Sequence, residues 1–176
     1  MNKILESIRT IPNFPKEGIM FRDVTTLFSN PSAFKETINE ICSYWKNKNL
    51  TKIIGIEARG FIIGSCISLE LGLPFIPIRK KGKLPHTTIE ESYELEYGKA
   101  TIEIHSDAIN SNDNVLIIDD LIATGGTALA SISLVKKLEG SVAGCSFIID
   151  LPSLDGKKRI LDLGIEVQTL CEFSGH

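Results

Sequence analysis

Short apolar runs divide the chain, and each run has the length of a buried β-strand. Five of them stand out, and the first four are rich in Ile and Val: residues 52–56, 74–78, 115–118, 142–149 and 165–170. A continuous apolar run, in contrast to an alternating one, is typical of a strand that is buried on both faces of its sheet. The pattern therefore predicts five core strands.

Helix-like segments lie between most of these runs. They cover residues 31–45, 60–71, 127–138 and 157–163, and the last two are followed by Gly140 and Gly164. Glycine just after a helical pattern is a common end signal. Because strands alternate with helices, the sequence predicts an α/β fold with a doubly wound, mainly parallel sheet of about five strands.

One region interrupts this alternation. Residues 79–105 are polar and punctuated by Gly and Pro, and they end in the alternating, strand-like pattern KATIEIH. Loops of this length are uncommon inside compact domains and are usually lids or binding loops. We therefore expect residues 79–105 to make a long excursion from the core.

Composition sets the broad class. The 176 residues are 43% hydrophobic and 23% charged, which predicts one globular domain and excludes disorder. The net charge of −3 gives no general attraction for nucleic acid, and no apolar stretch is long enough to span a membrane. The N-terminus also has no signal-like apolar block, so we expect a cytoplasmic protein. Four scattered cysteines indicate neither disulfides nor zinc.

The most informative segment is NVLIIDDLIATGGTALASISLVKKL, residues 114–138. It predicts a strand, two acids, a turn of small residues and a helix. Such a turn exposes backbone N–H groups at a helix N-terminus, where phosphate binds. The candidate phosphate-binding residues are Ala123, Thr124, Gly125, Gly126 and Thr127. Asp119 and Asp120 would suit the two hydroxyls of a ribose.

TGGT alone would equally fit a plain strand-to-helix turn, but the longer VLIIDDLIATGGT resembles the phosphoribosyl pyrophosphate (PRPP) signature of type I phosphoribosyltransferases. Two other phosphate motifs are not supported. Gly55 and Gly60 have the glycine spacing of a P-loop, but Phe61 stands where its Lys should be. No G-x-G-x-x-G follows a strand, so the nicotinamide dinucleotide fingerprint is missing.

Three further blocks resemble the adenine-specific branch, the adenine phosphoribosyltransferases. They are FPKEGIMFRDVTTL (residues 14–27), GIEARGF (55–61), and RKKGKLP with LEYGKA (79–85 and 95–100). The resemblance implies one phosphoribosyltransferase domain over residues 1–176, with a small hood at about 1–30 and a flexible lid at about 80–104. It also implies Mg²⁺ as cofactor, a homodimer, and the reaction of adenine with PRPP to give AMP and pyrophosphate.

The same resemblance assigns the acid/base chemistry. It implies Glu96 as the catalytic residue of the lid, with Tyr97 beside it; from the residues alone, the several glutamates of this region look alike. Enzymes for 6-oxopurines have an Asp just before the Thr-Gly pair, where this chain has Ala123. Adenine is therefore the expected base.

Substrate-binding residues follow in the same way. The resemblance places adenine at Met20, Phe21 and Arg22, although Phe21 taken alone would fit the core equally well. It also implies a pyrophosphate-binding set, for which a solvated basic turn is the alternative: Arg59, Arg79, Lys80 and Lys83.

Mg²⁺ is expected to bind mainly through the substrate, with Asp119 or Asp120 contributing through water. A regulatory protein that senses PRPP or purines on the same fold is the alternative function. Such proteins usually carry a DNA-binding segment or a basic face. This chain has no obvious helix-turn-helix before residue 50 and no net positive charge, which favours the enzyme.

Overall fold

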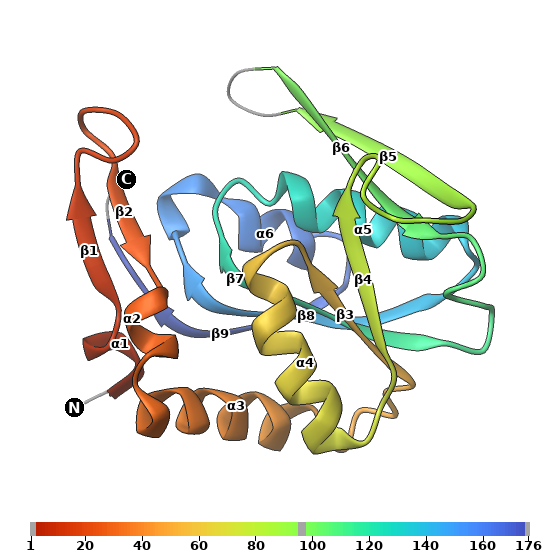
Figure 1. Cartoon of the computed structure of the whole chain (residues 1–176), viewed down its shortest axis with the longest axis horizontal. Helices are drawn as coiled ribbons and strands as arrows, with labels where there is room; N and C mark the ends of the chain where they lie inside the picture. Colours follow the sequence, from red (N-terminus) through yellow and green to blue (C-terminus); the bar gives the residue numbers. More distant parts are fainter. Residues whose placement is uncertain (1–2, 95–97, 175–176) are drawn as a thin grey trace.

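The computed structural model describes residues 3–94 and 98–174 and is built around one sheet of seven strands (Figure 1). Their order across the sheet is β5-β6-β4-β3-β7-β8-β9. The five strands from β4 to β9 in this order are parallel, whereas β6 runs antiparallel to both β4 and β5. The strand bounds are Lys52–Ile56 (β3), Phe75–Lys80 (β4), Thr88–Glu94 (β5), Lys99–His105 (β6), Asn114–Ile122 (β7), Ser141–Asp150 (β8) and Glu166–Glu172 (β9).

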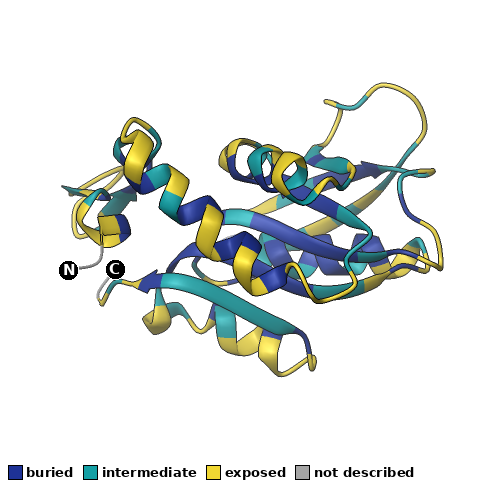
Figure 2. Cartoon of the chain, turned by 90° about the horizontal axis from the view of Figure 1, so that it is seen from below, coloured by how far each residue is buried: buried dark blue, intermediate teal, exposed yellow. Residues whose placement is uncertain are grey.

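Helices cover both faces of this sheet. The four longer ones are α3 (Pro31–Trp45), α4 (Arg59–Leu71), α5 (Gly126–Lys137) and α6 (Gly156–Leu161), and a 3₁₀ turn spans Pro152–Leu154. Ile53 and Leu116 pack with α3 and α4, while their chain neighbours Ile54 and Ile117 pack with α5 and α6. Because successive strand residues face opposite sides, the apolar runs supply both cores (Figure 2). The predicted doubly wound α/β fold is confirmed.

The N-terminal segment forms a small unit beside the sheet (Figure 1). It consists of α1 (Lys3–Glu6), the antiparallel strands β1 (Arg9–Pro12) and β2 (Met20–Asp23), and α2 (Thr25–Phe28). The guanidinium of Arg22 lies 4.4 Å from the ring centroid of Phe173 and donates to the carbonyl of Ser174. These contacts join β2 to the C-terminal segment.

The region 79–105 differs in part from its prediction. The strand pattern KATIEIH is confirmed as β6, but the polar stretch before it contains a second strand, β5, so most of this region is a hairpin at the sheet edge. The expectation of about five strands becomes seven for this reason. The sequence TIEESYE did not suggest a buried strand because β5 has only partly buried and exposed residues.

Candidate active site

The turn between β7 and α5 is built as predicted. Gly125 stands before the helix with φ of +80°, a left-handed conformation that favours glycine, and no side chain caps the helix N-terminus there. A cavity of about 220 Å³ opens on this turn. Its lining comprises Arg59, Asp119, Asp120, Leu121, Ile122, Ala123, Thr124, Gly125, Gly126, Thr127, Ala128 and Phe147. Backbone donors and the helix dipole together suit this cavity to an anion.

A second segment supports this turn from behind, and the sequence analysis missed it. The backbone N–H of Gly156 donates to the carbonyl of Ala123 (3.0 Å), and Arg159 Nη1 donates to the carbonyl of Thr124 (2.6 Å). A Cβ added at Gly125 would lie 3.1 Å from the Cα of Gly156. The signal available was a glycine after the next strand, since carboxyl ends of parallel strands meet at one edge of a sheet.

Asp119 and Asp120 lie within β7 and not after it. The Asp120 side chain is buried and pairs with Nε of Arg59, while Asp119 Oδ1 accepts from the backbone N–H of Asp120 (2.9 Å). Burial, followed by the negative charge of Asp120, raises the pKa of Asp119 well above its ordinary range. The carboxylate of Asp120 is therefore neutralised by Arg59, whereas that of Asp119 is not paired with Arg59.

Arg59 begins α4 and connects several parts of the site. Burial lowers the pKa of its guanidinium, but the hydrogen bond and charge of Asp120 raise that pKa by more, and Asp23 of β2 contributes in the same direction. Gly60, the next residue, permits the close approach of α4 to β7, because a Cβ at position 60 would lie 2.6 Å from the carbonyl oxygen of Ile118. Helix α4 can thus bring Arg59 directly over β7.

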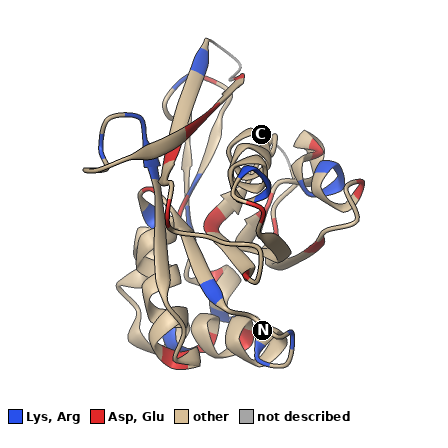
Figure 3. Ribbon diagram, turned by 90° about the vertical axis from the view of Figure 1, so that its right-hand side faces the viewer, with Lys and Arg blue, Asp and Glu red and all other residues tan. Residues whose placement is uncertain are grey.

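A second cavity, of about 350 Å³, adjoins the first. Its lining comprises Ile56, Glu57, Ala58, Arg59, Ile78, Arg79, Lys80, Tyr93, Ile102, Asp119, Asp120 and Thr127. The two cavities have four lining residues in common: Arg59, Asp119, Asp120 and Thr127. Three of the four predicted pyrophosphate residues, Arg59, Arg79 and Lys80, line the second cavity. Figure 3 shows where Lys and Arg residues lie along the ribbon.

Lys83, the fourth, is not among the residues that line this cavity. It is exposed in the loop after β4, where its backbone N–H donates to Glu103 and its carbonyl accepts from Arg79 Nη1. The structure therefore brings Arg59, Arg79 and Lys80 together and leaves Lys83 outside.

Two acids that the sequence analysis did not single out accept hydrogen bonds from the basic turn, residues 79–84. Glu57 Oε2 accepts from Nε of Arg79 (3.2 Å) and from the backbone N–H of Lys80 (3.1 Å). Burial raises the pKa of Glu57, but these hydrogen bonds lower it by more, so the net shift is downward. Glu103 of β6 is 3% exposed and accepts from the backbone N–H groups of Lys83 (2.8 Å) and Leu84 (2.7 Å). An acid in the middle of KATIEIH was the available signal.

The predicted adenine residues lie on β2, and neither cavity is lined by them. Phe21 is half-buried and packs edge-to-face on Phe14, with ring centroids 5.1 Å apart, and it belongs to neither hydrophobic cluster of the sheet. The side chain of Arg22 donates to Thr10 (2.6 Å). Glu96 and Tyr97 fall outside the described residues.

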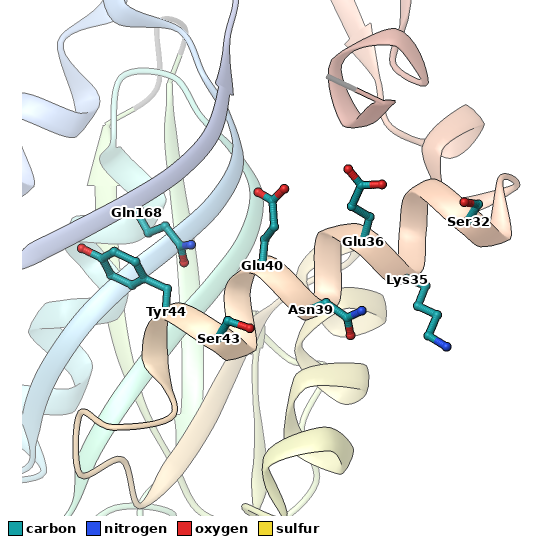
Figure 4. Close-up of a pocket in the computed structure, with 8 residues that line it drawn as sticks. All are labelled: Ser32, Lys35, Glu36, Asn39, Glu40, Ser43, Tyr44 and Gln168. Atoms are coloured by element: carbon teal, nitrogen blue, oxygen red, sulfur yellow. The ribbon is translucent and has the colours of Figure 1, made fainter. Parts of the chain in front are cut away.

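A larger hollow, of about 740 Å³, lies elsewhere (Figure 4). It is bounded by one face of α3 and by Gln168 of β9: Ser32, Lys35, Glu36, Asn39, Glu40, Ser43, Tyr44 and Gln168. It has no lining residue in common with either cavity at the phosphate turn. None of the predicted site residues that the structure describes lines this hollow.

Comparisons with known proteins identify the family of the chain. The model of the phosphoribosyl transferase domain family matches residues 23–170. An adenine phosphoribosyltransferase from Shewanella sp. strain ANA-3 is 54% identical over 175 residues, 99% of this chain and 96% of that protein. Among the helices of the described residues, none is long and apolar enough to cross a membrane.

Solved structures are similar over almost the whole chain. The adenine phosphoribosyltransferase of Rhodothermus marinus has a TM-score of 0.91 at 46% identity, covering 97% of each chain. The enzyme of Saccharomyces cerevisiae, solved with an imino-altritol bisphosphate and adenine, has a TM-score of 0.89 at 38% identity, covering 96% of this chain and 97% of its own.

Proposed function

Because the chain belongs to the adenine phosphoribosyltransferase family, we propose that its adjoining cavities bind PRPP and direct adenine to the anomeric carbon, giving AMP and pyrophosphate. One observation carries the proposal. An anion site made of backbone donors meets a cavity lined by Arg59, Arg79 and Lys80, with two carboxylates between them. This order of charges matches a molecule that has a phosphate, a diol and a pyrophosphate in sequence.

In this proposal, separate groups of residues bind the phosphate, the ribose and the pyrophosphate of PRPP. The turn from Ala123 to Thr127 binds the 5′-phosphate, and Asp119 and Asp120 accept hydrogen bonds from the ribose hydroxyls. Arg59, Arg79 and Lys80 hold the pyrophosphate and stabilise its charge as it leaves. Lys83 contributes through the general field of the basic turn.

Mg²⁺ belongs to the proposal, and the residues present fit a cation held mainly by substrate. Asp119 is partly buried beside Asp120, and its raised pKa indicates that a positive charge there would favour the ionised carboxylate. No group of three or more metal-binding side chains occurs in residues 3–94 and 98–174, so most ligands would come from substrate oxygens and water. A bound Mg²⁺ would supply charge neutralisation for the departing pyrophosphate.

Adenine recognition is proposed at β2, with Phe21 as a stacking surface and with Met20 and Arg22 beside it. A backbone acceptor there would pair with the exocyclic amine of adenine and leave the carbonyl of a 6-oxopurine unpaired. Glu96, next to Tyr97, is proposed to hydrogen-bond the imidazole side of adenine and to manage its proton as N9 attacks. A cytoplasmic homodimer completes the proposal, and light scattering of the purified protein tests the dimer.

Product formation tests the function. Purified protein is incubated with PRPP and Mg²⁺ and with adenine, hypoxanthine, guanine or orotate, and nucleotide and pyrophosphate are measured; a parallel sample contains EDTA. We expect AMP and pyrophosphate with adenine alone, and their loss with EDTA. Turnover of a 6-oxopurine would contradict the base assignment. PRPP binding without turnover of any base would favour the regulatory protein that senses PRPP or purines.

A further inference from the structure

Strand β5 lies along helix α5, the helix that begins at the phosphate turn. Glu91 of β5 accepts a hydrogen bond from the Ser133 hydroxyl (2.9 Å) and pairs with Lys137 Nζ (2.6 Å). Lys137 Nζ also donates to the carbonyl of Glu90 (3.2 Å). Ser133 and Lys137 are one helical turn apart, so both reach the same carboxylate. The strand is thereby fixed to the C-terminal half of the helix.

Tyr93 follows two residues later on the same face of the strand. A Cβ added at Gly126 would lie 3.0 Å from Cδ2 of Tyr93, so the aromatic ring rests against the first residue of α5. The strand and the helix therefore run in opposite directions: Glu91 meets the end of α5, and Tyr93 meets its beginning. Anchoring at Glu91 determines where Tyr93 lies over the phosphate turn.

Tyr93 also lines the second cavity, together with Asp119, Asp120 and Thr127. An aromatic ring in this position covers the place where, on the proposed function, the ribose and its leaving group lie. Excluding water matters there because the anomeric carbon develops oxocarbenium character, which water can capture. Water attack would put its oxygen on the anomeric carbon, release pyrophosphate and leave ribose 5-phosphate.

We propose that Tyr93 covers the reacting ribose, and that Glu91 is a positioning residue that, through Lys137 and Ser133, holds Tyr93 against Gly126. This inference rests on the proposed phosphoribosyl transfer. It distinguishes Glu91 from its neighbour Glu90, which the sequence pattern does not separate. Glu90 faces the other side of β5 and pairs with the exposed Lys81 (2.8 Å), away from α5.

The test compares four variants in the full-length protein: Tyr93→Ala, Tyr93→Phe, Glu91→Gln and, as the matched control, Glu90→Gln. For each, AMP and ribose 5-phosphate are measured from the same PRPP and adenine, so that the hydrolysed fraction is obtained with kcat and KM. A merely structural defect lowers the amount of active enzyme and leaves the hydrolysed fraction unchanged.

We expect Tyr93→Ala to lower kcat/KM for PRPP by about tenfold or more and to raise the hydrolysed fraction. Tyr93→Phe keeps the aromatic ring, so we expect its kcat/KM and its hydrolysed fraction to be close to those of the native protein. Glu91→Gln, which weakens a half-exposed ion pair, shifts both in the same direction by about threefold, whereas Glu90→Gln stays within about 1.5-fold of the native protein.

An unchanged hydrolysed fraction in Tyr93→Ala, or equal behaviour of Glu91→Gln and Glu90→Gln, would overturn the inference. If Tyr93→Ala does not fold, as judged by circular dichroism, the two glutamate variants decide. Failure of the native protein to form AMP would instead contradict the proposed function, so the two failures are distinguishable.

Discussion

The two adjoining cavities, which we propose bind the two ends of PRPP, are built in different ways. The phosphate half, the cavity proposed for the 5′-phosphate, is lined mainly by one continuous stretch, the end of β7 and the start of α5, which offers backbone donors. The pyrophosphate half, the cavity proposed for pyrophosphate, combines Arg59 at the start of α4 with Arg79 and Lys80 at the end of β4, and it offers charged side chains. The first depends on local backbone conformation, and the second depends on the register of the sheet.

Register explains how the dispersed half is assembled. Strand β3 lies between β4 and β7, with Ile56 opposite Ile78 and Gly55 opposite Ile118. The residues that follow these partners therefore lie at one edge of the sheet, where Glu57 meets Arg79. A contiguous motif can be recognised from its residues alone, whereas residues that come from separate elements can be grouped only when the pairing of the strands is known.

The largest expected effect comes from a substitution at Gly156, which supports the turn of the phosphate half. In Gly156→Ala the new Cβ would lie 2.2 Å from the carbonyl of Ala123 and 2.7 Å from the backbone nitrogen of Gly125, so the turn must move. A displacement on the order of 1 Å is expected to lower kcat/KM for PRPP by about 100-fold. Steady-state kinetics give the value, and Lys158→Ala on the same helix serves as the control. A native kcat/KM in Gly156→Ala would show that this support is dispensable.

The pyrophosphate half is expected to respond less, because several groups contribute to it. Glu57→Gln removes the charge that orients Arg79 and the end of β4. We expect KM for PRPP to rise by about tenfold, the loss of a charged hydrogen bond, with a smaller change in kcat. Glu70→Gln, an exposed change at the far end of α4, is the control. Equal KM values in both variants would contradict the orienting role of Glu57.

A pH experiment tests the region where β2 approaches Arg59. Hydrogen bonds from Thr25 and Arg9 lower the pKa of Asp23 to about 2. Because the folded-state pKa is lowered, this stabilisation is present above the unfolded value of about 4 and is lost as the pH falls toward 2. After allowance for solvent screening we expect about 1 kcal/mol in the free energy of unfolding.

Urea denaturation of the native protein and Asp23→Asn at pH 6 and pH 3 measures this contribution. The two proteins should differ by about 1 kcal/mol at pH 6 and by less at pH 3. A difference that is independent of pH would attribute the effect of the substitution to packing.

The smallest expected effect concerns Lys83, which lies outside the cavity that Lys80 lines. Lys83→Ala leaves the backbone N–H that binds Glu103 and should change KM for pyrophosphate in the reverse reaction by less than about twofold. Lys80→Ala should change it by about tenfold. Equal effects of the two substitutions would place Lys83 in the pyrophosphate site despite its position here.

Sequence reasoning succeeded where a structural signal is contained in neighbouring residues. The helix at Pro31–Trp45 and the strand at Lys52–Ile56 have the predicted bounds, because apolar periodicity and burial coincide there. Sequence reasoning failed for β5, because most residues of this strand are polar. One face of β5, with Glu91 and Tyr93, packs on α5, whereas Glu90 and Glu94 are exposed. A strand at the sheet edge needs no apolar face on its outer side.

The order of apolar and polar residues determined by itself the α/β class and the doubly wound sheet, and the contiguous small residues after β7 indicated the turn before α5, because each depends on local conformation and burial. The tertiary structure alone decided which charged residues act together. The motifs around Glu57 and Glu103 and the glycine at position 156 do not show which residues they contact, and the contact of Arg59 with Asp120 spans 61 positions. Such contacts form only when sheet register and helix packing bring distant residues within hydrogen-bond distance, and no periodicity records that distance.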